Sequence, residues 1–190
     1  MIDIFESIGC GGAVFKGFSS YESCVTIGAT QAISLVFRYL SKTRPHTKVL
    51  LLGYNYSIYD RCITTYKCQG LELIGDHSED STLPPISHVL DYIEINKPDL
   101  VVLTLPNNPS GELYNQSELG AIFTVCAQKG VYVLVDKVGL FDIPDENWPN
   151  VAQTIDESNA YGYTIIVNSF SKTCSIPGCR MGYIVDVIIN

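Results

Sequence analysis

Seven short apolar runs are spaced along the chain, and most of them lack the polar–apolar alternation of a half-exposed strand. They predict strands at residues 24–27, 48–52, 71–75, 100–105, 131–136, 163–167 and 181–189. Segments with apolar residues at helical spacing separate them at 31–40, 54–70, 86–96 and 116–129. Strands that are apolar on both faces belong in a sheet covered on both sides. The pattern therefore predicts the α/β class, as a three-layer α/β/α sandwich around a doubly wound, seven-stranded, mostly parallel sheet.

The length of 190 residues suits one domain, or part of a larger one. Residues 1–23 are rich in glycine, but no strand precedes these glycines as a dinucleotide-binding turn would require. We therefore predict an N-terminal segment at 1–23 and the main domain at 24–190.

Composition and charge exclude several classes of protein. With 46% hydrophobic and 17% charged residues, disorder is not expected, and no apolar run reaches the ~20 residues of a membrane-spanning helix. No basic cluster precedes an apolar run near Met1, so the expected location is the cytoplasm. The net charge of −8 argues against nucleic-acid binding. The seven cysteines and three histidines lack the spacing of a disulfide framework or a metal site.

Ligands of doubly wound sheets bind at the carboxyl ends of the strands, and several residues there suit an anion. Gly28-Ala29-Thr30 separates the first strand from the first helix, where backbone N–H groups and the helix dipole favour a phosphate. Alternatively, Thr30 only caps that helix. Ser169, Ser171 and Arg180 follow the sixth strand and would add hydroxyls and a guanidinium to the same anion.

Four other residues near strand ends suit a flat heterocycle. Asp136 would need a positive partner such as a protonated pyridine nitrogen, unless it only forms a turn. Tyr56 offers a ring face and Asn108 an amide donor, although either fits an ordinary rim or turn position as well. Lys172 offers an amine, or is one more solvated lysine. A pyridine with a phosphate, a phenolic oxygen and an aldehyde would engage all of them, and this ligand is pyridoxal 5'-phosphate (PLP).

The motifs occur in an order that resembles the fold-type I PLP enzymes and, among them, the class I and II aminotransferases. The matching segments are Gly28-Ala29-Thr30-Gln31-Ala32, Tyr54-Asn55-Tyr56-Ser57-Ile58-Tyr59, Pro106-Asn107-Asn108-Pro109-Ser110-Gly111, Asp136, and Ser169-Phe170-Ser171-Lys172 with Arg180. The resemblance covers residues 24–187 and implies the fold of that family's large, cofactor-binding domain.

The resemblance also implies a role for each matched residue. Lys172 would form a Schiff base with PLP and move the proton at the substrate's α-carbon, and Asp136 would keep the ring nitrogen protonated. The other matched residues would hold the ring (Tyr56 and Asn108) and the phosphate (Gly28, Ala29, Thr30, Ser169, Ser171 and Arg180).

Three departures from the family qualify this resemblance. Gly139 stands where the family usually has tyrosine, which implies a Schiff base that titrates at higher pH. Lys137 stands where an acidic residue is common. The family also continues into a small domain that supplies an arginine for the substrate's carboxylate, and this chain stops after its last strand. We therefore expect either a fragment or a split or minimal enzyme.

Two kinds of function follow from these observations. The first is a PLP-dependent aminotransferase for an amino acid or amine and a 2-oxo acid, or a decarboxylase, lyase or cyclase of the same fold, because substrate orientation decides which bond breaks. The second is a non-catalytic or dependent subunit of a PLP enzyme. A NAD-binding domain would need the glycine fingerprint that this chain lacks. The resemblance implies a homodimer, or pairing with a complementary small-domain chain.

Overall fold

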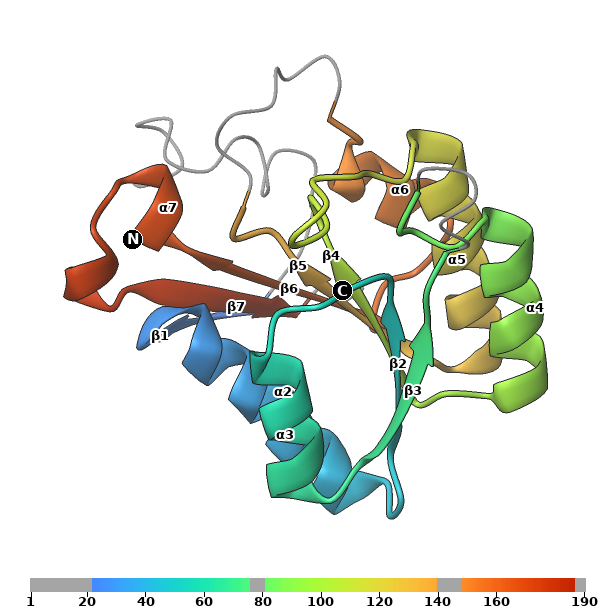
Figure 1. Cartoon of the computed structure of the whole chain (residues 1–190), viewed down its shortest axis with the longest axis horizontal. Helices are drawn as coiled ribbons and strands as arrows, with labels where there is room; N and C mark the ends of the chain where they lie inside the picture. The colour runs from blue at the N-terminus through green and yellow to red at the C-terminus, as the bar shows by residue number, and fades with distance from the viewer. Residues whose placement is uncertain (1–21, 76–80, 140–147, 187–190) are drawn as a thin grey trace.

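The computed structural model describes residues 22–75, 81–139 and 148–186, which form one seven-stranded sheet between two layers of helices (Figure 1). The strand order is β1-β7-β6-β5-β4-β2-β3. Strand β7 runs antiparallel to both of its neighbours, β1 and β6, whereas the remaining strand pairs are parallel. The predicted α/β class and the seven-stranded, mostly parallel sheet are confirmed.

The elements alternate along the chain as the hydrophobic pattern predicts. The strands are β1 (Glu22–Thr26), β2 (Lys48–Leu52), β3 (Gln69–Leu73), β4 (Leu100–Thr104), β5 (Tyr132–Asp136), β6 (Thr164–Ser169) and β7 (Gly182–Asp186). The helices are α2 (Gly28–Thr43), α3 (Ile58–Tyr66), α4 (Ile86–Asn96), α5 (Gln116–Lys129), α6 (Val151–Glu157), the single turn α7 (Phe170–Thr173), and the 3-10 turn η4 (Pro177–Cys179).

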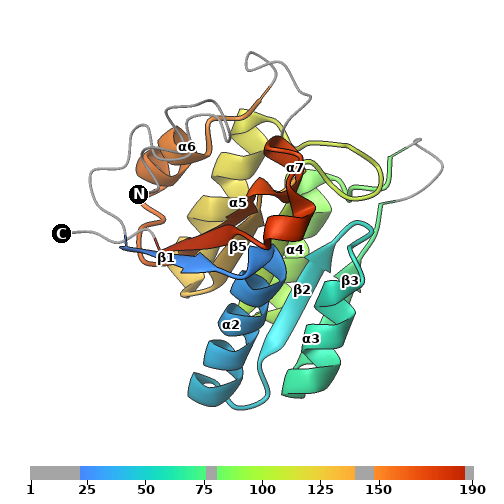
Figure 2. The same cartoon turned by 90° about the vertical axis from the view of Figure 1, so that its left-hand side faces the viewer.

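The two faces of the sheet are buried under different helices. Helices α2 and α3 cover one face and α4, α5 and α6 cover the other (Figures 1 and 2). Strand β2 shows how its side chains divide between them: Val49 and Leu51 join the core under α2 and α3, whereas Leu50 and Leu52 join the core under α4 and α5. Both faces of the central strands are therefore dry, which explains the continuous apolar runs in the sequence.

Helices α4 and α5 begin and end at the predicted residues because local signals fix their ends. The Asn115 side chain accepts hydrogen bonds from the N–H groups of Ser117 and Glu118, and the Glu118 carboxylate accepts a hydrogen bond from the Asn115 N–H, which completes a capping box. Gly130 then ends α5 in the left-handed conformation.

Several elements differ from the prediction. Helix α3 is shorter than 54–70, and β3 begins at Gln69 because residues 69 and 70 pair with Lys48 and Val49 of β2. Strand β1 begins at Glu22 and ends at Thr26, rather than covering 24–27.

Helix α2 is three residues longer at each end than 31–40. It begins with Gly28-Ala29-Thr30, and at the other end polar residues extend it beyond the apolar stripe, where Thr43 bonds back to the Tyr39 carbonyl. Helix α6 was not predicted, since it has only seven residues. Strand β6 continues through Asn168 and Ser169, because these polar residues pair with Tyr183 and Gly182 of β7.

The described residues contain no helix with the length and apolar character needed to cross a bilayer. The glycine-rich segment at 1–21 and residues 187–189 of the predicted last strand lie outside the described residues. The predicted division at residue 23 stays a prediction.

Candidate functional site

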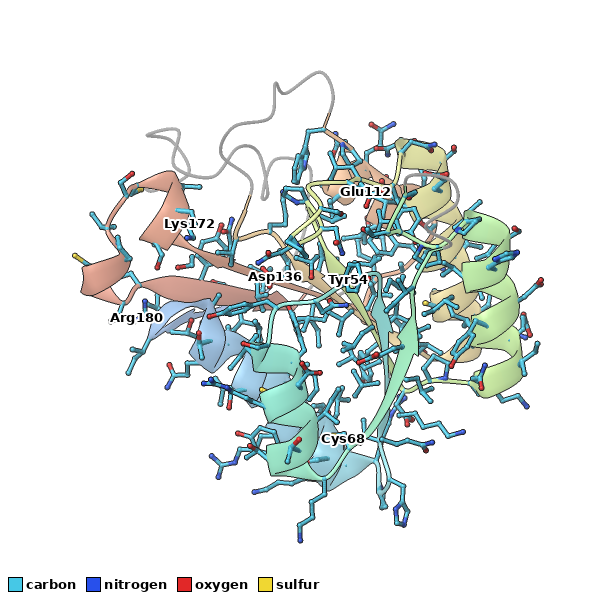
Figure 3. All side chains as sticks on the ribbon, in the orientation of Figure 1. Tyr54, Cys68, Glu112, Asp136, Lys172 and Arg180 are labelled. Carbon is cyan, nitrogen blue, oxygen red and sulfur yellow. The ribbon has the colours of Figure 1, made fainter. Side chains whose placement is uncertain are left out.

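A cavity of about 490 Å³ lies at the carboxyl ends of β4, β5 and β6, beside the first turn of α2. It is lined by nine of the ten residues predicted from the sequence: Ala29, Thr30, Tyr56, Asn108, Asp136, Ser169, Ser171, Lys172 and Arg180. The tenth, Gly28, lies directly against Arg180. Figure 3 shows Asp136 near the centre, with Lys172 and Arg180 on one side of it and Tyr54 on the other. The fold thus brings together residues that are far apart in the sequence.

The first turn of α2 presents backbone N–H groups to the cavity, and no side chain among the described residues caps them. Its N-cap residue, Ile27, provides no side-chain cap, and the Ile27 N–H bonds instead to the Gln31 side chain at 2.7 Å. Thr30 is exposed and lies inside the first turn, so it does not cap the helix as the alternative interpretation proposed. Free N–H groups at the start of a 16-residue helix attract anions.

Two glycines allow the arginine and β7 to approach this turn. A Cβ atom on Gly28 would lie 2.6 Å from Nη2 of Arg180, so the guanidinium occupies space that any other residue would fill. A Cβ atom on Gly182 would lie 2.7 Å from the carbonyl carbon of Gly28 and 2.8 Å from the nitrogen of Ala29. The arginine also donates through Nη1 to the Pro177 carbonyl at 3.0 Å. This end of the cavity therefore combines a helix terminus with a positive charge.

The two serines lie at the junction between β6 and α7. Ser169 is buried at the end of β6, and its hydroxyl lies 2.8 Å from Ser171 Oγ and 3.1 Å from the Met181 carbonyl oxygen. It also accepts a hydrogen bond from the Ser171 N–H at 3.1 Å, which begins the helical turn α7. This turn carries Lys172, which is exposed to solvent and lines the cavity.

Asp136 ends β5 as a buried carboxylate without a cationic partner among the described residues. Its side chain is 6% exposed, and it accepts hydrogen bonds from the Tyr59 hydroxyl at 2.6 Å and the Val138 N–H at 3.1 Å. Burial raises the pKa of Asp136, while the bonds from Tyr59 and Val138 act in the opposite direction. An anion in this position is stabilised by a positive charge that enters the cavity.

Tyr56 and Asn108 lie at the open side of the cavity. Tyr56 is 53% exposed, and Asn108 is also exposed, with no side-chain hydrogen bond to any described residue. The neighbouring Asn107 is instead buried and donates to the carbonyl oxygens of Leu52 and Tyr54 at 3.3 and 3.0 Å. Asn107 also lines the cavity, but its amide is held by these carbonyl groups, whereas the Asn108 amide has no partner among the described residues.

The main residue that sequence reasoning missed is Tyr59, the second residue of α3. It is completely buried, and its hydroxyl reaches Asp136 from 77 positions away in the sequence. Burial, together with the nearby Asp136 charge, raises the pKa of Tyr59 well above its usual range, so the hydroxyl remains a donor. The resemblance pointed to the Tyr54–Tyr59 segment, but no local pattern links Tyr59 to Asp136.

Tyr59→Phe is expected to lower the free energy of unfolding of the cofactor-free protein by about 1–2 kcal/mol at neutral pH, because Asp136 then keeps only the bond from Val138. The loss should shrink at acidic pH, where Asp136 is protonated. Chemical denaturation across this pH range measures both effects. Tyr66→Phe is the control, since the Tyr66 hydroxyl bonds to the Ser34 hydroxyl at 2.6 Å and to no carboxylate among the described residues. Equal and pH-independent losses in the two variants would contradict the expectation.

The two departures from the family motif occupy different surroundings. Gly139 lines the cavity, and a Cβ atom there would meet Pro106 Cδ at 3.4 Å, an ordinary contact. Lys137 is buried, with its Nζ 5.6 Å from the centre of the Trp148 ring. Lys137 therefore belongs to the packing around β5.

Comparisons with known proteins agree with this geometry. The chain matches the family model described as "Aminotransferase class I and II" over residues 15–187. It is 27% identical over 167 residues to an aspartate aminotransferase from Sulfolobus acidocaldarius, a match that covers 88% of this chain and 40% of that protein. This chain thus spans about 40% of the length of that curated relative.

Two solved structures show the same fold. Aminotransferase AspB from Helicobacter pylori superposes with a TM-score of 0.75 at 20% identity, over 87% of this chain and 43% of that one. A PLP-bound C–S lyase from Staphylococcus hominis superposes with a TM-score of 0.74 at 16% identity, over 88% of this chain and 42% of that one. These neighbours include an aminotransferase and a lyase, so the fold does not select one reaction.

Proposed function

The chain belongs to the class I and II aminotransferase family, and from that membership we propose that its cavity binds PLP as the cofactor-binding part of an aminotransferase-type enzyme. The observation that carries the proposal is the buried carboxylate of Asp136, which has no cationic partner among the described residues, in a cavity that also presents a helix terminus, Arg180 and Lys172. A ligand with a protonated ring nitrogen at one end and a phosphate at the other complements these charges.

The residues divide between the parts of that ligand. Gly28, Ala29 and Thr30 would donate backbone N–H groups to the phosphate, and Ser169, Ser171 and Arg180 would add their side chains. Asp136 would pair with the ring nitrogen, Tyr56 would stack on the ring and Asn108 would donate to the phenolic oxygen. PLP itself supplies an aldehyde that condenses with amines and a ring that withdraws electrons from the bonds at a substrate's α-carbon.

Lys172 would be the catalytic residue, with two tasks at one atom. Its Nζ would be the amine that attaches the cofactor, and after release the same Nζ would hold and return the proton of the α-carbon. Its exposed position on α7 allows such movement, because no hydrogen bond to a described residue fixes the ammonium group. The substrate would be an amino acid or an amine, with a 2-oxo acid as the second reactant.

A dependent subunit without activity of its own is the second candidate. The matched region corresponds to about 40% of the length of the relative named as an aspartate aminotransferase. In that case the remaining parts of the site would come from a second copy or from a complementary chain. A lyase-type reaction stays open within the first candidate, because a C–S lyase shares the fold.

Titration of the protein with PLP tests the proposed binding, and the visible absorption spectrum is the readout. The wild type is expected to develop a band that Lys172→Ala lacks, because only an attached lysine shifts the aldehyde's absorption. Lys129→Ala is the control, since Lys129 pairs with Glu94 at 2.8 Å on the surface of α5 and should keep the band. A wild type without the band, or a band that persists in Lys172→Ala, would overturn the proposal.

Addition of an excess of an L-amino acid to the loaded protein separates the two candidate functions. Loss of the visible band with formation of the corresponding 2-oxo acid indicates an enzyme. A band that stays unchanged until a complementary chain is added indicates a dependent subunit.

A further inference from the structure

The Glu112 side chain forms hydrogen bonds with a segment about 30 positions earlier in the sequence. Its Oε1 accepts hydrogen bonds from Ser81 Oγ at 2.6 Å and the Thr82 N–H at 3.1 Å, and its Oε2 also accepts from Thr82, from both the N–H and the hydroxyl. Two residues further on, the buried hydroxyl of Tyr114 donates to the Pro84 carbonyl at 2.9 Å. The segment 81–84 is therefore held at both ends.

The main chain of Glu112 closes the loop that presents Asn108 to the cavity. The Asn107 N–H donates to the Glu112 carbonyl at 2.9 Å, and the Ser110 hydroxyl accepts from the Glu112 N–H at 3.3 Å. The same hydroxyl donates to Asn107 Oδ1 at 3.1 Å. Because the Asn107 amide donates to Leu52 and Tyr54, the loop is tied to the segment that leads to Tyr56.

The segment 81–84 packs against the chain near Gly53, at the start of the segment that leads to Tyr56. A Cβ atom on Gly53 would lie 3.2 Å from the Thr82 carbonyl oxygen and 3.1 Å from Asn107 Nδ2. The Gly75 N–H donates to the Thr82 carbonyl at 3.0 Å. Glu112 thus connects three pieces of chain: the loop with Asn108, the segment 81–84, and the start of the segment with Tyr56.

The Glu112 carboxylate is charged, which strengthens the hydrogen bonds that it accepts. Burial raises its pKa, but the hydrogen bonds from Ser110, Ser81 and Thr82 outweigh burial and lower the pKa to about 2. The carboxylate is therefore ionised at neutral pH, and ionised acceptors make the stronger hydrogen bonds.

We propose that Glu112 is a positioning residue that sets Tyr56 and Asn108 against the cofactor ring, an inference that rests on the proposed binding of PLP. The phosphate end is built from α2, the end of β6 and Arg180, and among the described residues Glu112 forms no hydrogen bond to any of these parts. Glu112 therefore acts on the ring end alone.

Glu112→Gln tests the proposal, because glutamine keeps the shape but turns one acceptor into a donor that faces the donors of Thr82. Hydrogen exchange in the cofactor-free protein should become about tenfold faster at the amides of residues 53–56 and 107–111, and stay unchanged in the first turn of α2. Affinity for PLP should fall about tenfold, while affinity for inorganic phosphate should change less than about twofold.

Glu118→Gln is the matched control. The Glu118 carboxylate also accepts a hydrogen bond from a backbone N–H, that of Asn115 at 2.8 Å, but this bond lies at the N-terminal cap of α5. It should alter neither exchange in the two segments nor either affinity. Ser81→Ala removes one donor without changing charge and should produce a smaller change in the same direction as Glu112→Gln. Unchanged exchange in Glu112→Gln, or equal losses of PLP and phosphate affinity, would overturn the inference. A wild type that does not bind PLP would instead overturn the proposed function. Hydrogen exchange would still test whether Glu112 holds these segments in place.

Discussion

Asp136→Asn is expected to make the cofactor-free protein more stable at neutral pH while it weakens PLP binding. Burial raises the pKa of the Asp136 carboxyl, so its ionised form is unfavourable in the folded, empty protein. The wild type should therefore lose stability as the pH rises from the ordinary aspartate pKa through the raised one. The asparagine variant lacks this titration and should therefore be more stable than the wild type at pH 7.

The same substitution removes the negative charge that would face the ring nitrogen. One charge-assisted hydrogen bond is worth about 1.5–3 kcal/mol, so PLP affinity should fall about 10- to 100-fold. Denaturation curves between acidic and neutral pH, together with a PLP titration, measure the two effects.

Asp99→Asn is the control for Asp136→Asn. The Asp99 carboxylate accepts from the Lys48 N–H at 2.8 Å and pairs with Arg44 at 3.4 Å, far from the cavity. This substitution should lower stability and leave PLP affinity unchanged. A less stable Asp136→Asn protein, or one with unchanged affinity for PLP, would show that the buried carboxylate does not serve to pair with a positively charged ligand.

Gly182→Ala is expected to destabilise the fold by about 3 kcal/mol and to impair the phosphate end of the cavity. The added Cβ would lie 2.7 to 2.8 Å from three backbone atoms, which belong to Gly28, Ala29 and Asn168. Backbone atoms cannot rotate away as a side chain can, so either β7 or the first turn of α2 has to move. Thermal or chemical denaturation measures the cost, and competition with inorganic phosphate measures the damage to the site.

Gly178→Ala is the matched control, because a Cβ atom there would meet nothing within 4 Å and Gly178 has no positive φ. If Gly182→Ala fails to fold, Gly28→Ala provides a milder test. Its Cβ meets the flexible end of Arg180, although φ of +68° adds strain at this position. Phosphate affinity that is unchanged in Gly28→Ala would contradict the assignment of this turn and Arg180 to an anion.

Most of the sheet could be predicted because strands that are buried on both faces appear in the sequence as continuous apolar runs. Apolar runs marked β2 and β4 closely, and a capping asparagine and a terminal glycine marked the ends of α5. Helix α6 was not predicted because it is too short to show a helical pattern of apolar residues. Asn150 caps it after Pro149, and its buried residues Val151, Ala152 and Ile155 lie within seven positions. The continuation of β6 into Ser169 depends on pairing with β7, which no local pattern reveals.

The candidate site was predicted to the extent that its residues occur in recognisable motifs. Strand ends and a resemblance were sufficient to name nine of the residues that line the cavity. They were insufficient for Tyr59 and Glu112, whose partners lie 77 and about 30 positions away and become neighbours only through the fold. They also gave Asn107 no role, although its buried amide holds the motif loop against β2.

The most direct test of the central claim is to find which lysine holds PLP. The protein is incubated with PLP and reduced with borohydride, which fixes an attached cofactor to its lysine, and the digested peptides are then analysed by mass spectrometry. We expect one predominant modified peptide, with the added mass on Lys172. Modification spread over surface lysines such as Lys97 and Lys129, or no modification at Lys172, would contradict it.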